Sequence, residues 1–396
     1  MDILDANPIS FSAFPDDKAV FEPLNPEDVR AYLHKAVDFI SDYYTNVESM
    51  PVLPNVKPGY LQDELSASPP THSASFDVTM KELRTSVVPG MTHWASPNFF
   101  AFFPSTNSAA AIAGNLIASA MNTVGFTWLN PSKLLEVMQA DADAGLVPTY
   151  VCATVGTTSS NAVDPVGAIA DVAAMFNAWV HVDAAYAGSA CICPEFRHHL
   201  DGVEHVDSIS MSPHKWLLTC LDCTCLYVRD AHRLSDSLET NPEYLKNDAT
   251  ESGEVTDLKD MQVGVGRRFR GLKLWMVMRT YGTAKLQEHI RSDVAMAKMF
   301  EDFVRADNRF EVVVPRNFAL VCFRIKPSGA MTEEDADEAN RVLMENLNKT
   351  GKAYLAHTVV GDKFVLRFAV GSSLQEERHV TSAWDLIKKT TSGIMD

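Results

Sequence analysis

Lys215 is the residue of this chain whose type and position most clearly suggest chemistry. It follows residues 208–211, whose alternation of small and apolar side chains predicts a strand, and it ends the turn Ser212-Pro213-His214-Lys215. A lysine that is partly removed from water has a lowered pKa, because burial disfavours the charged amine, and such lysines form Schiff bases with carbonyl compounds. The alternative interpretation is an ordinary surface lysine after a strand, so the surrounding residues must decide.

Asp183 stands at the end of another predicted strand, residues 179–182, with the small Ala185 two positions beyond it. Ligands of open parallel sheets bind beyond the carboxyl ends of the strands, so Asp183 and Lys215 are expected to share a site. This pair suits pyridoxal phosphate: Lys215 would hold the aldehyde, Asp183 would keep the pyridine nitrogen protonated, and Ala185 would lie flat against the ring. Without Lys215, Asp183 would be interpreted as a helix N-cap.

The segments around these residues alternate between strand and helix patterns, which is typical of a parallel α/β sheet. Up to the lysine, the patterns predict strands at 148–155, 179–182 and 208–211 and a helix at 166–176. After it, they predict a strand at 223–229, a polar stretch at 236–262, a long helix from Arg267, and a smaller α/β unit with strands at 310–314, 318–325, 353–357 and 364–369 and helices at 333–347 and from Leu374. A polar stretch of this length is typical of a lid or of disorder.

The N-terminal part predicts an arm followed by helices. Residues 1–24 lack periodicity, Asn25 is suited to cap a helix that runs to about Asn46, and a second helix is expected at 75–87. A helix with little local core to cover is a candidate for packing on a partner subunit. We therefore expect the regions 1–90 (arm and dimer-clasping helices), 91–305 (cofactor-binding large domain) and 306–396 (small α/β domain).

The composition limits the kinds of partner. The 396 residues are 46% apolar and carry a net charge of −17, which disfavours nucleic acid and anionic membranes. No apolar run is long enough to span a membrane and residues 1–21 lack a signal-peptide pattern, so we expect a cytoplasmic location without nucleic-acid or membrane partners.

The seven cysteines indicate free thiols rather than a disulfide framework, because their number is odd and the context is not secretory. Cys220, Cys223 and Cys225 could suggest zinc, but no second Cys/His pair stands at metal-binding spacing, so no metal is expected. A nicotinamide-dependent dehydrogenase is not expected either, because no G-x-G-x-x-G motif follows a strand.

Motifs in four regions together resemble the plant aromatic L-amino-acid decarboxylases, the tryptophan and tyrosine decarboxylases of the pyridoxal-phosphate fold-type I superfamily. They are HWASP at 93–97, WVHVDAAYAGS at 179–189, SPHKW at 212–216 and NPEYLKN at 241–247, in family order. The resemblance implies that Lys215 is the Schiff-base lysine and that Asp183 is its pyridinium partner. It also places near the cofactor Thr157 or Thr158, Ala185, Ser212 and His214, and it implies that His214, next to Lys215, is a catalytic residue as well.

The same resemblance implies the substrate and the reaction. Tyr244 would lie on a lid over the neighbouring subunit's site and return a proton to Cα, which favours an amine product, whereas relatives with phenylalanine there release aldehydes. The aromatic wall would be formed by Trp94, Phe102, Phe103 and Pro104. Gly266 would leave room for a bicyclic ring, so the expected reaction converts L-tryptophan to tryptamine. An aromatic aldehyde synthase on the same scaffold is the alternative.

The sequence match to the family is interrupted between Trp128 and Leu129, where family members have roughly a hundred more residues than this chain. The missing segment would carry the first strands of the large sheet, a phosphate-binding turn and a histidine stacked on the pyridine ring. We therefore expect an α/β fold of type I with a truncated large-domain sheet and weak or no activity. The chain would form a homodimer, or pair as an inactive variant with full-length subunits.

Overall fold

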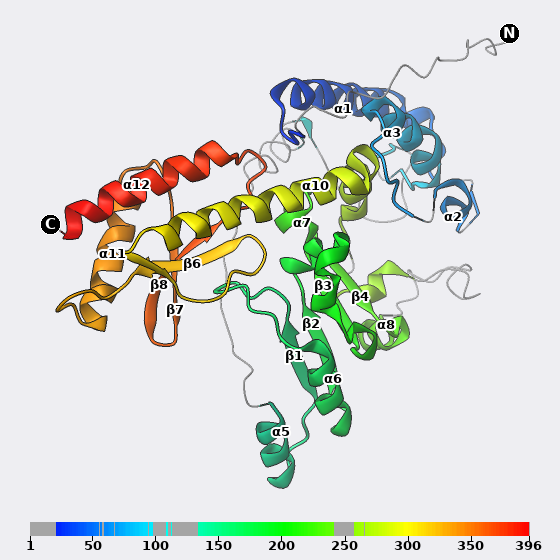
Figure 1. The fold of residues 1–396 in the computed structure, drawn as a ribbon. Helices are drawn as coiled ribbons and strands as arrows, with labels where there is room; N and C mark the ends of the chain where they lie inside the picture. The colour runs from blue at the N-terminus through cyan, green and yellow to red at the C-terminus, as the bar shows by residue number, and fades with distance from the viewer. Residues whose placement is uncertain are drawn as a thin grey trace.

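The fold is described from a computed structural model, which covers residues 21–395 except 55, 58, 67, 94, 98–107, 110–111, 113–133, 241–256 and 265. Three regions follow one another along the chain: N-terminal helices, a four-stranded sheet that carries the lysine, and a C-terminal sheet with its own helices. The long helix α10, Arg270–Ala306, crosses the molecule from the N-terminal helices to the C-terminal sheet (Figure 1).

The N-terminal helices begin where the sequence predicts. Asn25 caps α1 by accepting hydrogen bonds from the backbone N–H groups of Glu27 and Asp28, and Ser75 caps α3 in the same way through Val78. The helical segments are α1 Pro26–Asn46, a 3₁₀ turn Val47–Ser49, α2 Tyr60–Glu64, α3 Phe76–Glu82, a π turn Leu83–Val87 and a 3₁₀ turn Val88–Gly90. Helix α1 buries none of its residues.

The sheet that precedes and follows the lysine has the order β1-β2-β3-β4. Strands β1, β2 and β3 are parallel, as the strand and helix alternation predicts, and β4 is antiparallel to β3. The elements are α5 Leu134–Asp143, β1 Tyr150–Thr154, α6 Val166–Met175, β2 Trp179–Asp183, 3₁₀ helices Ala187–Ile192, Pro194–Leu200 and Val203–His205, β3 Ser208–Met211, α7 Pro213–Trp216, β4 Cys225–Val228, α8 Ala231–Leu238 and a 3₁₀ helix Leu258–Met261.

The two faces of this sheet differ. On one face, Val151, Ala153, Val180 and Val182 are buried in the main core. The other face carries the alternate residues, among which Tyr150 is 58% exposed. Within the described residues β1 pairs with β2 alone, so it is an edge strand. Parallel sheets normally bury both faces, so this arrangement agrees with the expected truncation of the sheet.

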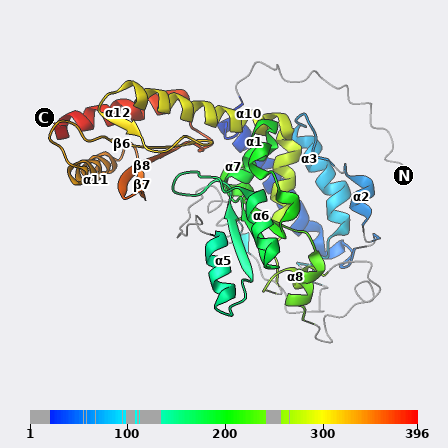
Figure 2. The same cartoon turned by 60° about the horizontal axis from the view of Figure 1, so that its bottom comes forward.

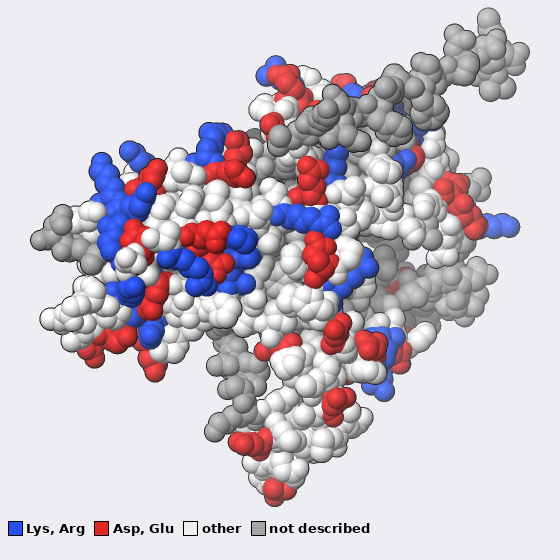
Figure 3. All heavy atoms as spheres, in the orientation of Figure 1, with Lys and Arg blue, Asp and Glu red and all other residues white. Residues whose placement is uncertain are grey.

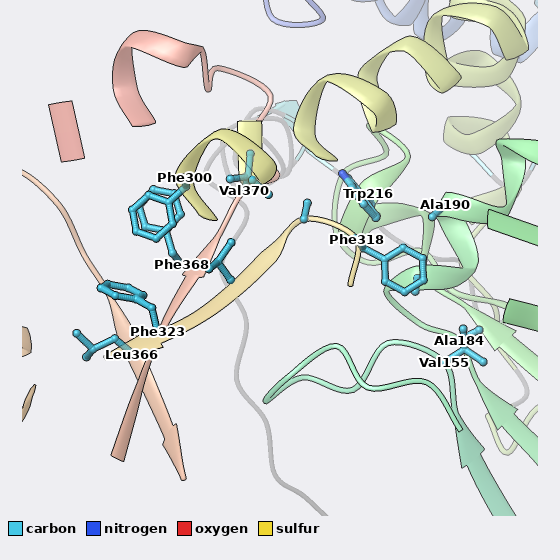
Figure 4. Close-up of a cluster of buried hydrophobic side chains, with 14 of the residues drawn as sticks. Val155, Ala184, Ala190, Trp216, Phe300, Phe318, Phe323, Leu366, Phe368 and Val370 are labelled. Carbon is cyan, nitrogen blue, oxygen red and sulfur yellow. The ribbon is translucent and has the colours of Figure 1, made fainter. Parts of the chain in front are cut away.

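The C-terminal unit is an antiparallel sheet of order β5-β6-β8-β7 packed against helices. Its elements after α10 are β5 Phe310–Val312, β6 Leu320–Ile325, α11 Glu333–Lys349, β7 Ala356–Val360, β8 Lys363–Ala369 and α12 Glu377–Met395. Phe300 of α10 stacks on Phe368 with ring centroids 3.7 Å apart and meets Phe323 edge-on, as Figure 4 shows. Every residue of β6 is buried, so this core is closed.

Helix α10 bends at Gly282, whose φ of 68° lies in the left-handed region. A Cβ at this position would stand 2.7 Å from the carbonyl carbon of His72, so only glycine fits without a shift of the backbone. The carbonyls of Pro70 and Thr71 accept hydrogen bonds from Thr283 and Ala284. The bend therefore joins α10 to the segment that precedes α3, and Figure 2 shows α10 and the N-terminal helices side by side.

The part of the molecule around α5 is acidic. Residues 134–196 contain no Lys or Arg, and in Figure 3 the end of the molecule that carries α5 shows acidic but no basic side chains. All seven cysteines are free in this structure. In the described part of the chain, no helix is long and apolar enough to cross a membrane, and no group of His, Cys, Asp and Glu could hold a metal ion.

Candidate active site

The carboxyl ends of β2 and β3 lie side by side and carry most of the predicted residues. The register pairs Asp183 with Ser210, and Ala184 N–H donates to Ser210 O at 3.0 Å. One step further, Ser212 N–H donates to Ala185 O, also at 3.0 Å. These bonds hold Asp183, Ala185 and Ser212 at one edge of the sheet, where the parallel-sheet argument predicts them.

Lys215 lies one short turn beyond β3, on α7. Its backbone N–H donates to Ser212 O at 2.9 Å, and its side chain is half-buried. Burial lowers the pKa of Lys215 below its ordinary value, and the nearby Asp183 carboxylate opposes that shift only in part. The amine is therefore easier to deprotonate than a surface lysine, which a nucleophilic amine requires.

Asp183 does not cap the helix that follows it. Its Oδ1 accepts a hydrogen bond from the backbone N–H of Ala185 at 2.9 Å, and the next 3₁₀ helix, Ala187–Ile192, has Tyr186 at its N-cap position. Since Asp183 pairs with Thr154 of β1 in the sheet register, both lie on the more exposed face of the sheet. The carboxylate thus stands at the strand end of that face, beside Lys215.

Ser212 and His214 are bound to the loop that follows the lysine. The Ser212 hydroxyl lies 2.9 Å from the Thr224 hydroxyl. His214 Nδ1 lies 2.7 Å from the carbonyl oxygen and 3.2 Å from the nitrogen of Cys223, so either tautomer fixes the ring to this residue. Strand β4 begins at Cys225 and not at the predicted Cys223, because one backbone group of Cys223, its carbonyl or its N–H depending on the tautomer, binds the imidazole instead of a neighbouring strand.

The threonines after β1 differ from each other. Thr157 closes its own loop, because its hydroxyl accepts from Ala162 N–H at 3.0 Å and lies 3.3 Å from the Ser160 hydroxyl. Thr158 is exposed. Both follow the strand that adjoins β2, which places their loop at the same edge of the sheet as Asp183.

Of the predicted lid and substrate residues, the structure describes Gly266 and not the others. Tyr244, Trp94, Phe102, Phe103 and Pro104 lie outside the described residues. Gly266 is exposed before α10, its carbonyl accepts from Gln262 Nε2 at 2.9 Å, and a Cβ there would meet no atom within 4 Å. A side chain at position 266 would thus meet none of the described atoms, and the role of Gly266 in admitting a bicyclic ring stays a prediction.

Three residues behind the lysine were not predicted as part of the site. Trp216 stacks on Tyr186, with ring centroids 4.6 Å apart, and its indole N–H donates to Asp293 at 2.7 Å. The sequence identifies Trp216 only as an apolar residue after the lysine. The one available signal for Asp293 is a carboxylate among the apolar residues Ile290, Met296 and Ala297 of a helix, all of which are buried.

The donor set suits the aldehyde and ring ends of pyridoxal phosphate. A half-buried amine of lowered pKa and a carboxylate stand at neighbouring strand ends, as an aldehyde and a protonated pyridine nitrogen require. At the phosphate end, the hydroxyls of Ser212 and Thr157 are already engaged within the chain. The fit is thus good for the reactive part of the cofactor and weaker for its phosphate.

Comparisons with known proteins show the family of the chain. The family model described as the pyridoxal-dependent decarboxylase conserved domain matches residues 58–133 and 129–326. The chain therefore belongs to the pyridoxal-dependent decarboxylase family, and its α/β fold is that of the type I enzymes, as the resemblance predicts.

Among individual relatives, it is 66% identical over 514 aligned residues to tryptophan decarboxylase 1 of Oryza sativa subsp. japonica, with 100% of both chains covered. The crystal structure of Oryza sativa TDC with PLP and tryptamine matches with a TM-score of 0.67 and 67% identity over 95% of this chain and 100% of that chain. The structure of Rhodiola rosea 4-hydroxyphenylacetaldehyde synthase matches with a TM-score of 0.63 and 37% identity over 94% and 100%.

The alignment also bears on the missing segment. Its length of 514 residues exceeds the 396 residues of this chain, so the rice relative contains residues that have no counterpart here. The family model matches in two pieces that meet at residues 129–133. The sequence match to the family is interrupted at the same place, between Trp128 and Leu129. This point directly precedes α5 and the edge strand β1.

Proposed function

We propose that this chain is a pyridoxal-phosphate-dependent carboxy-lyase of aromatic L-amino acids, acting on L-tryptophan to give tryptamine. The observation that carries the proposal is the half-buried Lys215, whose pKa is lowered by burial, at the same sheet edge as Asp183. Support comes from the similarity to the rice enzyme, whose structure contains PLP and tryptamine.

In this proposal Lys215 would hold the aldehyde of the cofactor, Asp183 would keep its pyridine nitrogen protonated, and Ala185 would lie against the ring. The bound cofactor supplies an electron sink for the pair of electrons that remains on Cα when carbon dioxide leaves. Tyr244 then donates a proton to Cα. The wall of Trp94, Phe102, Phe103 and Pro104 orients the substrate ring, with room for an indole beside Gly266. His214 and Ser212 hold the turn of the lysine against residues 223–224.

The proposal includes weak activity of the chain by itself. The open face of the β1–β4 sheet ends at Asp183, and the hydroxyls predicted near the phosphate bind other groups of the chain. Full assembly would involve a second subunit, either a copy or a full-length relative, docked on α1. This helix exposes Leu33, Val37 and Tyr44 and buries nothing. We also propose the division into 1–90, 91–305 and 306–396, and a cytoplasmic location.

The experiment is to purify the chain, add pyridoxal phosphate and record its visible absorbance, with tryptamine measured by chromatography after addition of L-tryptophan. Lys215→Ala should abolish the absorbance of the bound cofactor, whereas the control Lys298→Ala, an exposed lysine on α10, should leave it unchanged. A wild-type chain that binds no cofactor would contradict the proposal. Cofactor bound to every subunit with full activity would contradict its weak-activity part.

The aldehyde synthase is the second candidate, favoured by the similarity to the Rhodiola rosea enzyme. Tyr244 opposes it, because the resemblance associates tyrosine at this place with amine formation. Measuring hydrogen peroxide beside tryptamine separates the two reactions. We expect tryptamine without peroxide from the wild-type chain, and peroxide with an aldehyde from Tyr244→Phe.

A further inference from the structure

A buried aromatic pair joins the two elements that carry the cofactor residues. Trp216, which is 1% exposed, follows Lys215 directly on α7, and Tyr186 lies in the loop after Asp183. Their rings stack with centroids 4.6 Å apart and planes 8° apart, and Phe318 meets Trp216 edge-on at 6.4 Å. The position of one ring therefore fixes the position of both elements relative to each other.

The only polar atom of the indole points at α10. Figure 4 shows the nitrogen of Trp216 on the side of the α10 ribbon, and Nε1–H donates to Asp293 Oδ2 at 2.7 Å. Asp293 is 2% exposed, and His289 Nε2 lies 3.5 Å from the same oxygen. Burial raises the pKa of Asp293 to about 6 and lowers the pKa of His289 to about 4. At neutral pH the pair is thus a carboxylate and a neutral imidazole.

A buried carboxylate is costly for the fold, because it loses its hydration and a single indole N–H and a neutral ring replace little of it. An apolar side chain would pack at this place at a lower cost if the site served only the core. What the carboxylate provides is a strong, directional hydrogen bond to the residue next to Lys215. The Asp293 carboxylate therefore does not stabilise the fold; it fixes the position of Trp216, the residue next to Lys215.

We propose that Asp293 is a positioning residue for Lys215, which it orients by binding the indole N–H of Trp216. The proposal rests on the function proposed for Lys215. The N-terminal end of helix α10 holds the segment that follows this turn, where Arg270 binds Asp222 at 2.7 Å and Lys273 Nζ donates to Cys220 O at 2.8 Å. The lysine is thus held between two points of one helix, and Asp293 is the one whose partner, Trp216, is adjacent to Lys215 in sequence.

Substitutions at both ends of the bond test this role. Asp293→Asn keeps an acceptor for the indole, Asp293→Leu removes it, and Trp216→Phe removes the donor. Asp302→Leu, which replaces an exposed carboxylate on the same helix, is the matched control. Cofactor affinity is measured by visible absorbance, and the amount of Lys215 modified is measured by borohydride reduction followed by peptide mass spectrometry.

We expect Asp293→Leu and Trp216→Phe each to weaken cofactor binding about tenfold, which is the effect of leaving one buried polar group unpaired. Asp293→Asn should stay within about twofold of the wild type, because its amide oxygen restores the bond. In a Trp216→Phe background, Asp293→Leu should add no further loss, since both changes break one interaction. Wild-type affinity in Asp293→Leu, or a full additional loss in the double variant, would overturn the proposal.

A second measurement does not need the cofactor. Hydrogen exchange of residues 212–217 should be faster in Asp293→Leu than in the wild type and unchanged in Asp293→Asn and Asp302→Leu. Equal exchange in all four proteins would overturn the positioning role even if the chain binds no pyridoxal phosphate. A wild-type chain without a reduced adduct at Lys215 would instead contradict the proposed function, so the two failures are distinguishable. If Asp293→Leu does not fold, Trp216→Phe replaces it in both measurements.

Discussion

Among the described residues, the two sheets have four strands each and differ in how they are covered. In the C-terminal sheet, β6 is buried along its whole length between helices and neighbouring strands. In the sheet that carries the site, β1 alternates between buried and open residues and forms an edge. Burial, which stabilises the fold, is therefore greatest in the C-terminal sheet. The residues proposed for the chemistry lie instead on a sheet with one partly exposed face and an exposed edge strand.

The largest effect is expected in the closed core. Phe323→Ala should lower the free energy of unfolding by about 3–5 kcal/mol, because it removes a fully buried ring between Phe300 and Phe310. Urea denaturation followed by circular dichroism measures it, with Tyr354→Ala, which is 85% exposed, as a control expected within about 0.5 kcal/mol of the wild type. A loss below about 1 kcal/mol would show that this core is looser than described.

A second test concerns the bend that connects α10 to the N-terminal region. Gly282→Ala should cost about 2–4 kcal/mol, because the left-handed φ disfavours alanine and its Cβ would meet the backbone of His72. The damage should be local. Limited proteolysis is expected to cleave near residues 70–73 first, while Gly371→Ala, where nothing lies within 4 Å of the new Cβ, should leave the cleavage pattern unchanged.

The buried carboxylate of Asp293 is expected to make the free energy of unfolding depend on pH, by about 2 kcal/mol or less. The folded-state pKa of Asp293 is raised to about 6 by burial, above an unfolded value of about 4. The stability from this group is therefore fully present below pH 4 and is lost as the pH rises through 6. Asp293→Asn should consequently gain stability relative to the wild type between pH 5 and pH 8, measured by denaturation at both values. The neighbouring His289 is present in both proteins, so its own titration largely cancels. A constant difference would contradict the raised pKa.

The smallest effect is expected on the open face. Tyr150→Ser should change the free energy of unfolding by less than about 0.5 kcal/mol, because the ring is largely exposed. The matched change on the covered face, Val151→Ser, should be clearly destabilising. Similar losses for both would mean that the open face is covered in solution, for example by another subunit.

The sequence predicted the elements better than the contacts between them. The Asn25 cap, the parallel order of the strands and the shared edge of Asp183 and Lys215 follow from local patterns and the geometry of parallel sheets. The bond between Trp216 and Asp293 spans 77 residues, and nothing in local periodicity pairs a tryptophan with a carboxylate so distant. The start of β4 was misplaced for a similar reason, since the imidazole of His214 binds one backbone group of Cys223.

The bend at Gly282 has a kinetic consequence. Thr283 bonds to Pro70 across 213 residues, and Trp216 bonds to Asp293 across 77, so α10 closes loops of very different length on its two sides. Contacts between distant parts of a chain form slowly, because the entropy of loop closure is lost before the contact compensates for it. We therefore expect the C-terminal sheet, whose strands are near neighbours in sequence, to fold first. The lysine would acquire its final surroundings only when the N-terminal segment reaches Gly282.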